Sequence, residues 1–531
     1  MITNSGTRCQ ELYAPADEVL HAQAGHGVSA TGRPVAGGAF SRSREQLEEI
    51  VGWLAAADAD GFEHGELECR LESDGRELLR LLLQDHLDLR AVREQRLAAV
   101  SDEHGILRGT VERDHQRQLA SVFGEVTVSR LAYRQRGEEN RHVADGVLNL
   151  PVEHASHGVR RIAATQSAHG SFEHATGQVR ERTGLELGKL QVEQLAVRAA
   201  VDVEAFYAER VTAEQEREPD SKDVLVISAD GKGIVMRSDA LRDATAKAAA
   251  RASQKLKTRV SKGEKPNRKR IAEVGAVYDV EPVPRTPAEV LAPAKDKTQK
   301  PPKAKRKWLT ASVVEDAATV IADIFDEACR RDGEHQRTWV ALVDGNNHQI
   351  DRIKTEARKR NVKVTILIDW IHVVEYLWGA AWCFFTEGDP AAEEWVHEKA
   401  LQVLAGKAGI VAAAIRRKAT KLALPDEKRA KADRAADYLL NKKPHLDYPT
   451  ALEHGWPVAT GVIEGACRHL IKDRMDITGA RWGLTGAEAI LKLRAVTTNG
   501  DLDEYWQYHL AHERHRNHDL RYANSIVPRE A

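Results

Sequence analysis

Hydrophobic residues in the first part of the chain are spaced three and four positions apart, as in amphipathic helices. This spacing covers residues 43–122 and returns over residues 155–200. Between these blocks, residues 125–134 alternate apolar and polar side chains and include β-branched residues, which predicts a strand or hairpin. We therefore expect residues 41–220 to form a mainly helical region with one hairpin. Residues 1–40 are rich in Gly, Ala and Ser without clear periodicity, which predicts a disordered arm.

The pattern changes abruptly at residue 224. An apolar run over residues 224–229 ends at Asp230, and a Gly turn and a second short strand are expected to follow. Further strands are predicted at residues 270–283, 338–345 and 362–369, helices at 312–331 and 348–360, and an extended, proline-rich loop at 284–308. Strands followed by alternating helices and strands predict a mixed α/β sheet.

The chain of 531 residues is longer than a single hydrophobic core usually accommodates, so two or three domains are expected. The strands place an α/β region in residues 221–372. Residues 373–460 have a helical pattern and separate the last strand from a final unit at residues 461–531. No apolar stretch approaches membrane-spanning length, and the N-terminus lacks a secretory pattern. The five cysteines form no C-x-x-C pair, which favours a reducing cytoplasm and argues against a cysteine zinc site.

Charge is segregated although the net charge is only −2. Residues 45–104 hold 16 acidic and 6 basic residues, and this segment matches no motif. Residues 242–270 hold 11 basic and 2 acidic residues, and residues 295–307 hold 7 basic and 1 acidic. Both basic segments are predicted to be loops that contact a polyanion, and nucleic acid is the first candidate. The alternative is that they are solvated loops that bind nothing. The candidate contacts are Lys255, Lys257, Arg259, Arg268, Lys269, Arg270, Lys305, Arg306 and Lys307.

A candidate helix-turn-helix lies in residues 155–200. Ser171 is placed to cap one helix, Thr183-Gly184 ends it, and a second helix follows. In a helix-turn-helix the second helix enters the DNA major groove. The candidate contacts on or beside it are Lys189, Gln191 and Gln194. An ordinary helical hairpin is the alternative interpretation.

Acidic residues recur at the carboxyl ends of the predicted strands. Asp230, Asp344 and Asp369 each end an apolar run, and Glu464 lies near the start of a later helix. Ligands of open α/β sheets bind outside the carboxyl ends of the strands. Carboxylates gathered there repel one another unless cations neutralise them, and Mg²⁺ prefers such oxygen ligands. Two Mg²⁺ ions, for which Mn²⁺ can substitute, would support phosphodiester chemistry. A single strand-end Asp more often caps the following turn.

At these residues the sequence resembles bacterial insertion-sequence transposases of the ISKra type, members of the DDE superfamily with an RNase H-like core. The resemblance rests on ADGKGIVMR (229–237), VALVDG (340–345), DWIHVVEYLWGAAW (369–382) and TGVIEGACRHLIKDRMDITGARW (460–482), and more weakly covers about 120–510. It implies Mg²⁺-dependent DNA cleavage and strand transfer at terminal inverted repeats. It places the catalytic and metal-binding triad on Asp230, Asp344 and Glu464, and an Asp-x-x-His motif on Asp369 and His372. It also implies that residues 373–460 are a helical insertion in a core formed by residues 221–372 and completed by residues 461–531.

One position departs from the wider DDE pattern. The Lys or Arg that many members carry seven residues after the Glu is Ile471 here, beside Lys472. Arg468, four residues after Glu464, is the better candidate for a phosphate contact. We expect Asp369 to cap the following helix, with His372 pairing with it or contacting a DNA end.

Three functions remain open from the sequence. The first is a DNA transposase that acts on double-stranded DNA and oligomerises on the DNA ends. The second is a nuclease or resolvase on the same core that cuts without joining. The third is a non-catalytic DNA-binding protein derived from a transposase, which the three retained carboxylates disfavour.

Overall fold

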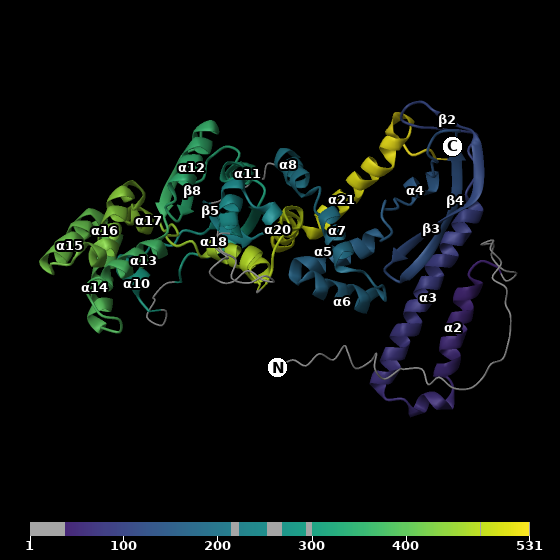
Figure 1. Ribbon diagram of the computed structural model, residues 1–531, viewed down its shortest axis with the longest axis horizontal. Helices are drawn as coiled ribbons and strands as arrows, with labels where there is room; N and C mark the ends of the chain where they lie inside the picture. Colours follow the sequence, from purple (N-terminus) through teal and green to yellow (C-terminus); the bar gives the residue numbers. More distant parts are fainter. Residues whose placement is uncertain (1–37, 214–221, 252–267, 294–299, 478, 530–531) are drawn as a thin grey trace. The chain divides into compact units, whose positions relative to one another are not determined.

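The computed structural model describes residues 38–213, 222–251, 268–293, 300–477 and 479–529 (Figure 1). The expected arm at residues 1–40 lies almost wholly outside the described residues. The chain forms two compact units. The first unit consists of Met1–Ala199 with Trp506–Ala531, and the second of Ala200–Tyr505.

A five-stranded sheet forms the centre of the second unit. Its strands are β5 (Val224–Val235), β6 (Lys269–Val280), β7 (Ala304–Ser312), β8 (Trp339–Val343) and β9 (Val364–Ile368). They lie in the order β7-β6-β5-β8-β9. β5, β6 and β7 pair antiparallel, whereas β8 pairs parallel with β5 and with β9. The predicted mixed α/β sheet is therefore confirmed.

Two details of the predicted strands are wrong. β5 does not turn after Asp230 but continues to Val235, because residues 231–235 stay paired with β6. β7 begins inside the segment predicted as a loop, because residues 304–312 complete the sheet beside β6. Trp308 and Leu309 are buried there, so the apolar residues at the end of the segment favour a strand despite the prolines that precede them.

The two basic segments also differ from the predicted loops where they are described. In 242–270, α9 (Asp243–Arg251) is helical and β6 begins at Lys269, and residues 252–267 lie outside the described residues. In 295–307, residues 304–307 belong to β7 and residues 295–299 lie outside the described residues.

Helices cover the sheet of the second unit and connect its strands. α11 (Ala317–Arg331) precedes β8 and packs on β6. Gly275 of β6 allows this packing, because a Cβ at that position would lie 2.7 Å from Ile324 of α11. α12 (Asn347–Lys359) joins β8 to β9, and α20 (Leu484–Asn499) packs on β7. Two further helices of this unit are α8 (Val203–Ala213) and α10 (Pro287–Leu291).

Residues 373–460 are helical, as predicted. The helices are α13 (Trp370–Ala381), α14 (Pro390–Leu404), α15 (Ala408–Lys421), α16 (Asp426–Asn441) and α17 (Tyr448–Glu453). After them, α18 (Gly461–Ala466) packs on β5 and β6, and it continues through a π-helical turn (Cys467–Lys472) into α19 (Asp473–Met475).

The first unit begins with α2 (Ser41–Leu54) and α3 (His64–Arg93), which pack together. A hairpin is present as β3 (Thr110–Ser121) and β4 (Gly124–Arg134), preceded by the short β1 (Val100–Ser101) and β2 (Leu107–Arg108). The strand predicted at residues 125–134 is β4, but the helical prediction for residues 43–122 is wrong after α3 ends, because β3 pairs with β4 along its length. The other helices of this unit are α4 (Val143–Val147), α5 (His157–His169), α6 (Phe172–Thr183) and α7 (Lys189–Ala199).

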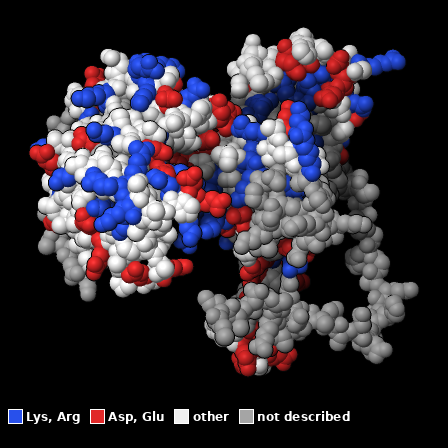
Figure 2. All heavy atoms as spheres, turned by 60° about the vertical axis from the view of Figure 1, so that its left-hand side comes forward, with Lys and Arg blue, Asp and Glu red and all other residues white. Residues whose placement is uncertain are grey.

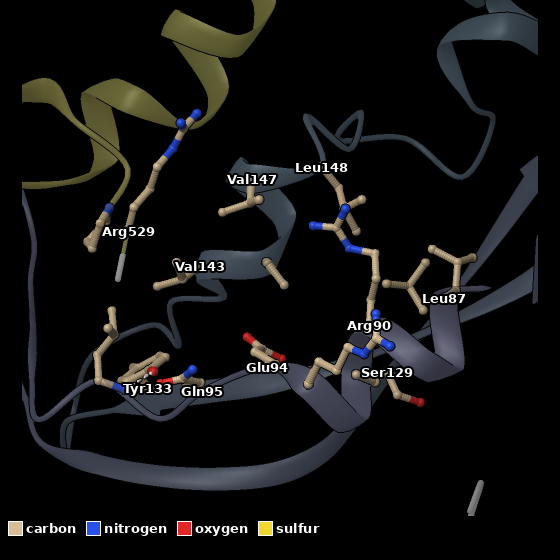
Figure 3. Close-up of a pocket in the computed structure, with 16 residues that line it drawn as sticks. Leu87, Arg90, Glu94, Gln95, Ser129, Tyr133, Val143, Val147, Leu148 and Arg529 are labelled. Atoms are coloured by element: carbon tan, nitrogen blue, oxygen red, sulfur yellow. Dashed lines mark hydrogen bonds between the residues drawn. The ribbon is translucent and has the colours of Figure 1, made fainter. Parts of the chain in front are cut away.

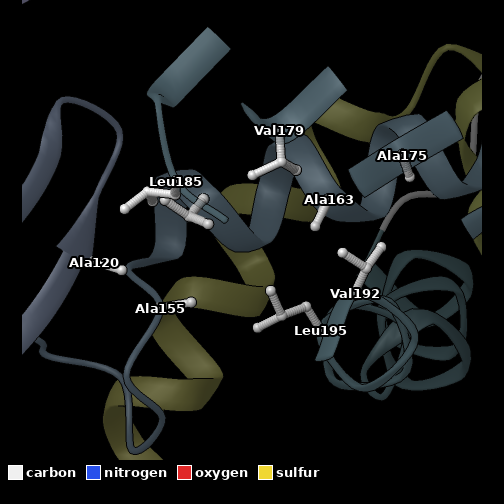
Figure 4. Close-up of a cluster of buried hydrophobic side chains, with 9 residues drawn as sticks. Ala120, Ala155, Ala163, Ala175, Val179, Leu185, Val192 and Leu195 are labelled. Atoms are coloured by element: carbon white, nitrogen blue, oxygen red, sulfur yellow. The ribbon is translucent and has the colours of Figure 1, made fainter. Parts of the chain in front are cut away.

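The helices α5, α6 and α7 share one small hydrophobic core (Figure 4). Val159, Ala163, Val179 and Val192 are all fully buried in it. The predicted caps of α6 are confirmed: the Ser171 side chain accepts a hydrogen bond from the His174 N–H, and Gly184 ends the helix with φ 72°. The candidate helix-turn-helix is thus part of a compact three-helix cluster.

The end of the chain belongs to the first unit, although the sequence suggested that all of 461–531 completes the core. α21 (Leu502–Asn517) supplies Glu513, which forms a buried ion pair with Arg160 of α5. Arg160 is fully buried, and His509 of α21 also contacts it. Among the described residues, no helix is long and apolar enough to cross a membrane.

Candidate metal centre

Asp369 lies where β9 passes into α13. Its side chain is completely buried and caps α13, because Oδ1 accepts a hydrogen bond from the Ile371 N–H (2.9 Å). The predicted capping role is therefore confirmed. The second carboxylate oxygen accepts a hydrogen bond from the Thr460 hydroxyl. Both oxygens of this buried carboxylate are satisfied, as a buried charge requires.

Thr460 immediately precedes α18, so its bond to Asp369 fixes where that helix begins. The Glu464 N–H donates to the Thr460 carbonyl (3.1 Å) in the first turn of α18. The Trp370 N–H donates to the Val458 carbonyl (2.8 Å), which holds the returning chain beside the start of α13. Asp369 and Thr460, which are 91 residues apart in the sequence, therefore lie together at the end of β9.

Asp369, His372 and Glu464 bring one potential ligand atom each within 4.8 Å of the others. His372 is partly exposed and its Nδ1 lies 3.1 Å from Glu375 Oε2. Burial and then the charge of Asp369 raise the pKa of Glu464, while His372 opposes this shift. Asp230 also contributes to the raised pKa of Glu464. Neighbouring negative charges that raise the pKa of a carboxyl group mark a place where a cation would be favourable.

Asp230 reaches the same helix through Cys467. The Cys467 Sγ–H donates to Asp230 Oδ2 (3.2 Å), and the Gly231 N–H donates to Asp230 Oδ1 (2.7 Å). Burial and the neighbouring Asp230 raise the pKa of the Cys467 thiol, so it stays protonated and donates. Asp230 is half-buried in mid-strand, with Val274 opposite it on β6.

Glu273 is a carboxylate that the sequence reasoning missed. It lies on β6 opposite Gly231, one pair along from Asp230. Burial and the charge of Asp230 raise the pKa of Glu273, whereas a hydrogen bond from Gln349 lowers it. Pairing β6 with an unbroken β5 would have placed Glu273 next to Asp230. The predicted turn after Asp230 interrupted β5 at this point, so the register that brings the two carboxylates together was not found.

Asp344 follows β8 and is half-buried. Its Oδ1 accepts a hydrogen bond from the Asn346 N–H (2.8 Å), and its carbonyl accepts one from the Tyr438 hydroxyl (3.0 Å). The strand-end position is as predicted, but Asp344 is not in the close group that Glu464 forms with Asp369 and His372.

The two basic candidates after Glu464 lie in the π-helical turn. The Arg468 side chain is 77% exposed, and its Nε lies 3.7 Å from Asp473. Lys472 is also exposed. A π-turn places residues differently from an α-helix, so spacing alone does not fix their faces.

Several predicted DNA contacts of the second unit have partners within the protein. Arg306 Nε lies 2.8 Å from Asp279, and Lys305 Nζ lies 3.0 Å from Glu281. Arg270 Nε donates to the Val313 carbonyl (2.7 Å). Lys307 is exposed, and Arg268 and Lys269 are partly buried. Lys255, Lys257 and Arg259 lie outside the described residues.

The candidate contacts on α7 are all exposed. Lys189 Nζ lies 3.1 Å from Glu173, and Gln191 Oε1 accepts a hydrogen bond from the Gly188 N–H (2.8 Å) at the start of the helix. Gln194 lies one turn further along. The buried face of α7 packs in the three-helix core, which leaves these side chains on the outward face.

A cavity of about 450 Å³ also lies in the first unit (Figure 3). Apolar side chains such as Leu87 and Val143 line it together with Arg90 and Glu94. Glu94 Oε2 accepts a hydrogen bond from the Leu131 N–H (2.8 Å), and burial raises the pKa of Glu94. The Glu94 carboxylate thus stabilises β4 from the cavity wall.

No protein-family model and no curated protein matches the chain.

Proposed function

We propose that this protein is a DNA transposase with an RNase H-like core and a DDE mechanism. The observation that carries the proposal is that Asp230 and Glu464, two of the three proposed ligands, converge on one region of a mixed sheet beside the buried Asp369. The strand order supports the same proposal, because three antiparallel strands are followed by two parallel ones. The helical insertion between Asp344 and Glu464 agrees with the resemblance in the sequence.

The donor set fits divalent cations. The half-buried Asp230 and the exposed Glu464 offer carboxylate oxygens. The charge of Asp230 contributes to the raised pKa of both Glu273 and Glu464, as expected where negative charges are incompletely compensated. Asp230, Asp344 and Glu464 would hold Mg²⁺, with Mn²⁺ as a substitute. Bound divalent ions would activate a water or a 3′-hydroxyl and stabilise the leaving oxygen of the phosphodiester.

The surrounding residues have positioning roles in this proposal. Asp369 has both oxygens engaged, so it orients α13 and α18 rather than contributing a free ligand. The Cys467 thiol holds Asp230 toward α18 by donating to its carboxylate. On the first unit, α7 would read base edges through Gln191 and Gln194, as the second helix of a helix-turn-helix does.

The test compares nearly isosteric substitutions of the carboxylates. Asp230→Asn, Asp344→Asn and Glu464→Gln should each abolish DNA cleavage and leave DNA binding intact. Glu394→Gln on the exposed surface of α14 is the matched control and should keep full cleavage. A carboxylate variant with near wild-type cleavage would remove that residue from the triad.

Strand-transfer products separate the alternatives. A transposase joins the cleaved end to target DNA, whereas a nuclease or resolvase on the same core releases cut ends only. A protein that binds DNA but neither cuts nor joins would support the non-catalytic alternative.

A further inference from the structure

Helices α15 and α16 of the insertion form a basic hairpin. Residues 407–443 contain 11 Lys and Arg but only 4 Asp and Glu. The two helices pack together through small apolar residues such as Ala412 and Ala435, which are fully buried. Figure 2 brings this part of the molecule forward and shows Lys and Arg side chains gathered into patches on its surface. None of these residues was among the candidate DNA contacts from the sequence.

Some of these cations are already neutralised within the hairpin. Arg416 pairs with Asp437, and Arg429 makes a two-bond pair with Asp433 (2.8 and 3.1 Å). Lys418 lies 4.0 Å from the ring centre of Phe385. These three cations therefore have local roles.

Lys431 and Arg434 differ from those cations. Both side chains are exposed, and neither has an acidic partner among the described residues. Arg434 Nε donates a hydrogen bond to the carbonyl of Ala430 in its own helix (3.3 Å), which leaves its charge uncompensated. Two uncompensated cations on one helix create a site of positive potential.

These two cations lie on the face of α16 that reaches the candidate metal centre. Lys431, Arg434 and Tyr438 are spaced three and four residues apart, so they share one face. The Tyr438 hydroxyl donates to the Asp344 carbonyl (3.0 Å), and its ring stacks on Tyr376 with 3.9 Å between ring centres. One turn further, Lys442 contacts the side chain of Asn347 at the start of α12. The face therefore leads from solvent to the end of β8.

We infer that the face of α16 formed by Lys431 and Arg434 binds the phosphate backbone of the DNA strand that enters the carboxylate site. The inference rests on the proposed function for the identity of the polyanion. From residue 431 to residue 438 the helix rises about 10 Å, at about 1.5 Å per residue. Successive phosphates of one strand are about 3.4 Å apart along the DNA axis, so the face matches about three nucleotides.

The test measures how salt weakens DNA binding by the full chain. A duplex of arbitrary sequence is titrated by fluorescence anisotropy without divalent ions, over a series of KCl concentrations. Each phosphate contact contributes about 0.9 to the slope of log K against log salt. Lys431→Gln with Arg434→Gln should make the slope shallower by about 1.8, and each single change by about half of this.

The matched control removes two cations from the same hairpin. Arg416→Gln with Arg429→Gln changes the formal charge equally, but those side chains are engaged by acids, so the slope should change much less. Lys431→Arg with Arg434→Lys keeps both charges and should retain the wild-type slope. A wild-type slope for the Gln double variant, or equal flattening by the control, would overturn the inference.

Failure of the proposed function has a different signature. If the wild-type chain does not bind duplex DNA at low salt, both the proposed function and this inference fail. If it binds and cleaves DNA while the Gln double variant keeps the wild-type slope, the inference alone fails. Glu464→Gln should bind with the wild-type slope, because its change affects cleavage only.

Discussion

The hydroxyl of Thr460 donates a hydrogen bond to the buried carboxylate of Asp369, 91 residues earlier in the chain. The bond joins the end of β9 to the start of the helix that carries Glu464. The helical insertion therefore begins and ends at the same place, and its size does not affect the position of Glu464. This explains how a long helical segment fits between two parts of one site.

Replacing Thr460 with Val should destabilise the second unit. Val keeps the shape of the side chain but leaves one oxygen of a fully buried carboxylate without its hydrogen bond, which costs about 1–3 kcal/mol. Urea unfolding measures this loss, and Thr460→Ser should recover most of it. Unchanged stability of the Val variant would show that Asp369 does not depend on this hydroxyl.

Asp344 and Asp369 should respond differently to substitution. Asp344→Asn should lose all cleavage activity, whereas Asp369→Asn keeps an oxygen that can cap α13 and should lose only part. Cysteine variants sharpen the comparison, because thiolate accepts Mn²⁺ more readily than Mg²⁺. Manganese should restore cleavage to Asp344→Cys and not to Asp369→Cys. The reverse result would make Asp369 the second metal ligand, as its closeness to Glu464 allows.

The raised pKa of Glu464 predicts a pH-dependent stability in the absence of metal. Burial and Asp369 disfavour its charged form. A carboxyl group whose folded pKa is raised contributes stability that is present at acidic pH and is lost as the pH rises through that pKa. At neutral pH without divalent ions, Glu464→Gln should therefore melt at a higher temperature than the wild type.

Metal should reverse this order. A cation that binds only the folded protein raises the melting temperature. In thermal melting experiments, Mn²⁺ should raise the melting temperature of the wild type and have little effect on that of Glu464→Gln. Equal stabilisation of both proteins would place the bound ion elsewhere.

The pair between Arg160 and Glu513 should dominate the acid stability of the first unit. Burial alone would raise the pKa of Glu513, but hydrogen bonds from His509 and Arg160 outweigh it and lower the pKa below its usual range. Glu513→Gln should cost about 1–3 kcal/mol at neutral pH, because the buried Arg160 loses one carboxylate partner and keeps Glu153.

The pH dependence of that cost follows from the lowered pKa. The stabilisation is present above the unfolded pKa of Glu and is lost as the pH falls through the folded pKa. Wild type and Glu513→Gln should therefore differ most at neutral pH and converge in strong acid, as followed by circular dichroism. The exposed Glu125→Gln should match the wild type throughout.

The sequence predicted elements whose signals are local. The cap at Ser171, the stop at Gly184 and the capping role of Asp369 depend on residues within a few positions of one another, and all three are present. The buried strands ending near Asp344 and Asp369 were equally clear, because β8 is a run of five apolar residues and β9 interrupts such a run only at Thr365, as is typical of buried parallel strands.

Non-local pairing explains what the sequence missed. Asp-Gly after an apolar run is typical of a turn, but pairing with all of β6 keeps β5 extended through Gly231 and Gly233. The Glu273 contact depends on that register and could not be predicted without it. The partners of Lys305 and Arg306 lie on other strands or follow them, so these cations looked free in a basic segment.

The two sides of the candidate metal centre should exchange amide hydrogens at very different rates. Asp230 lies in the middle of a strand bonded to β6 along its whole length and to β8 along its first part, so its neighbours open only with the sheet. Glu464 lies on a six-residue helix that continues into a π-turn, so its amides can open by local unfolding. The position of one carboxylate is thus set by the sheet, whereas the position of the other depends on a short helix anchored at Thr460.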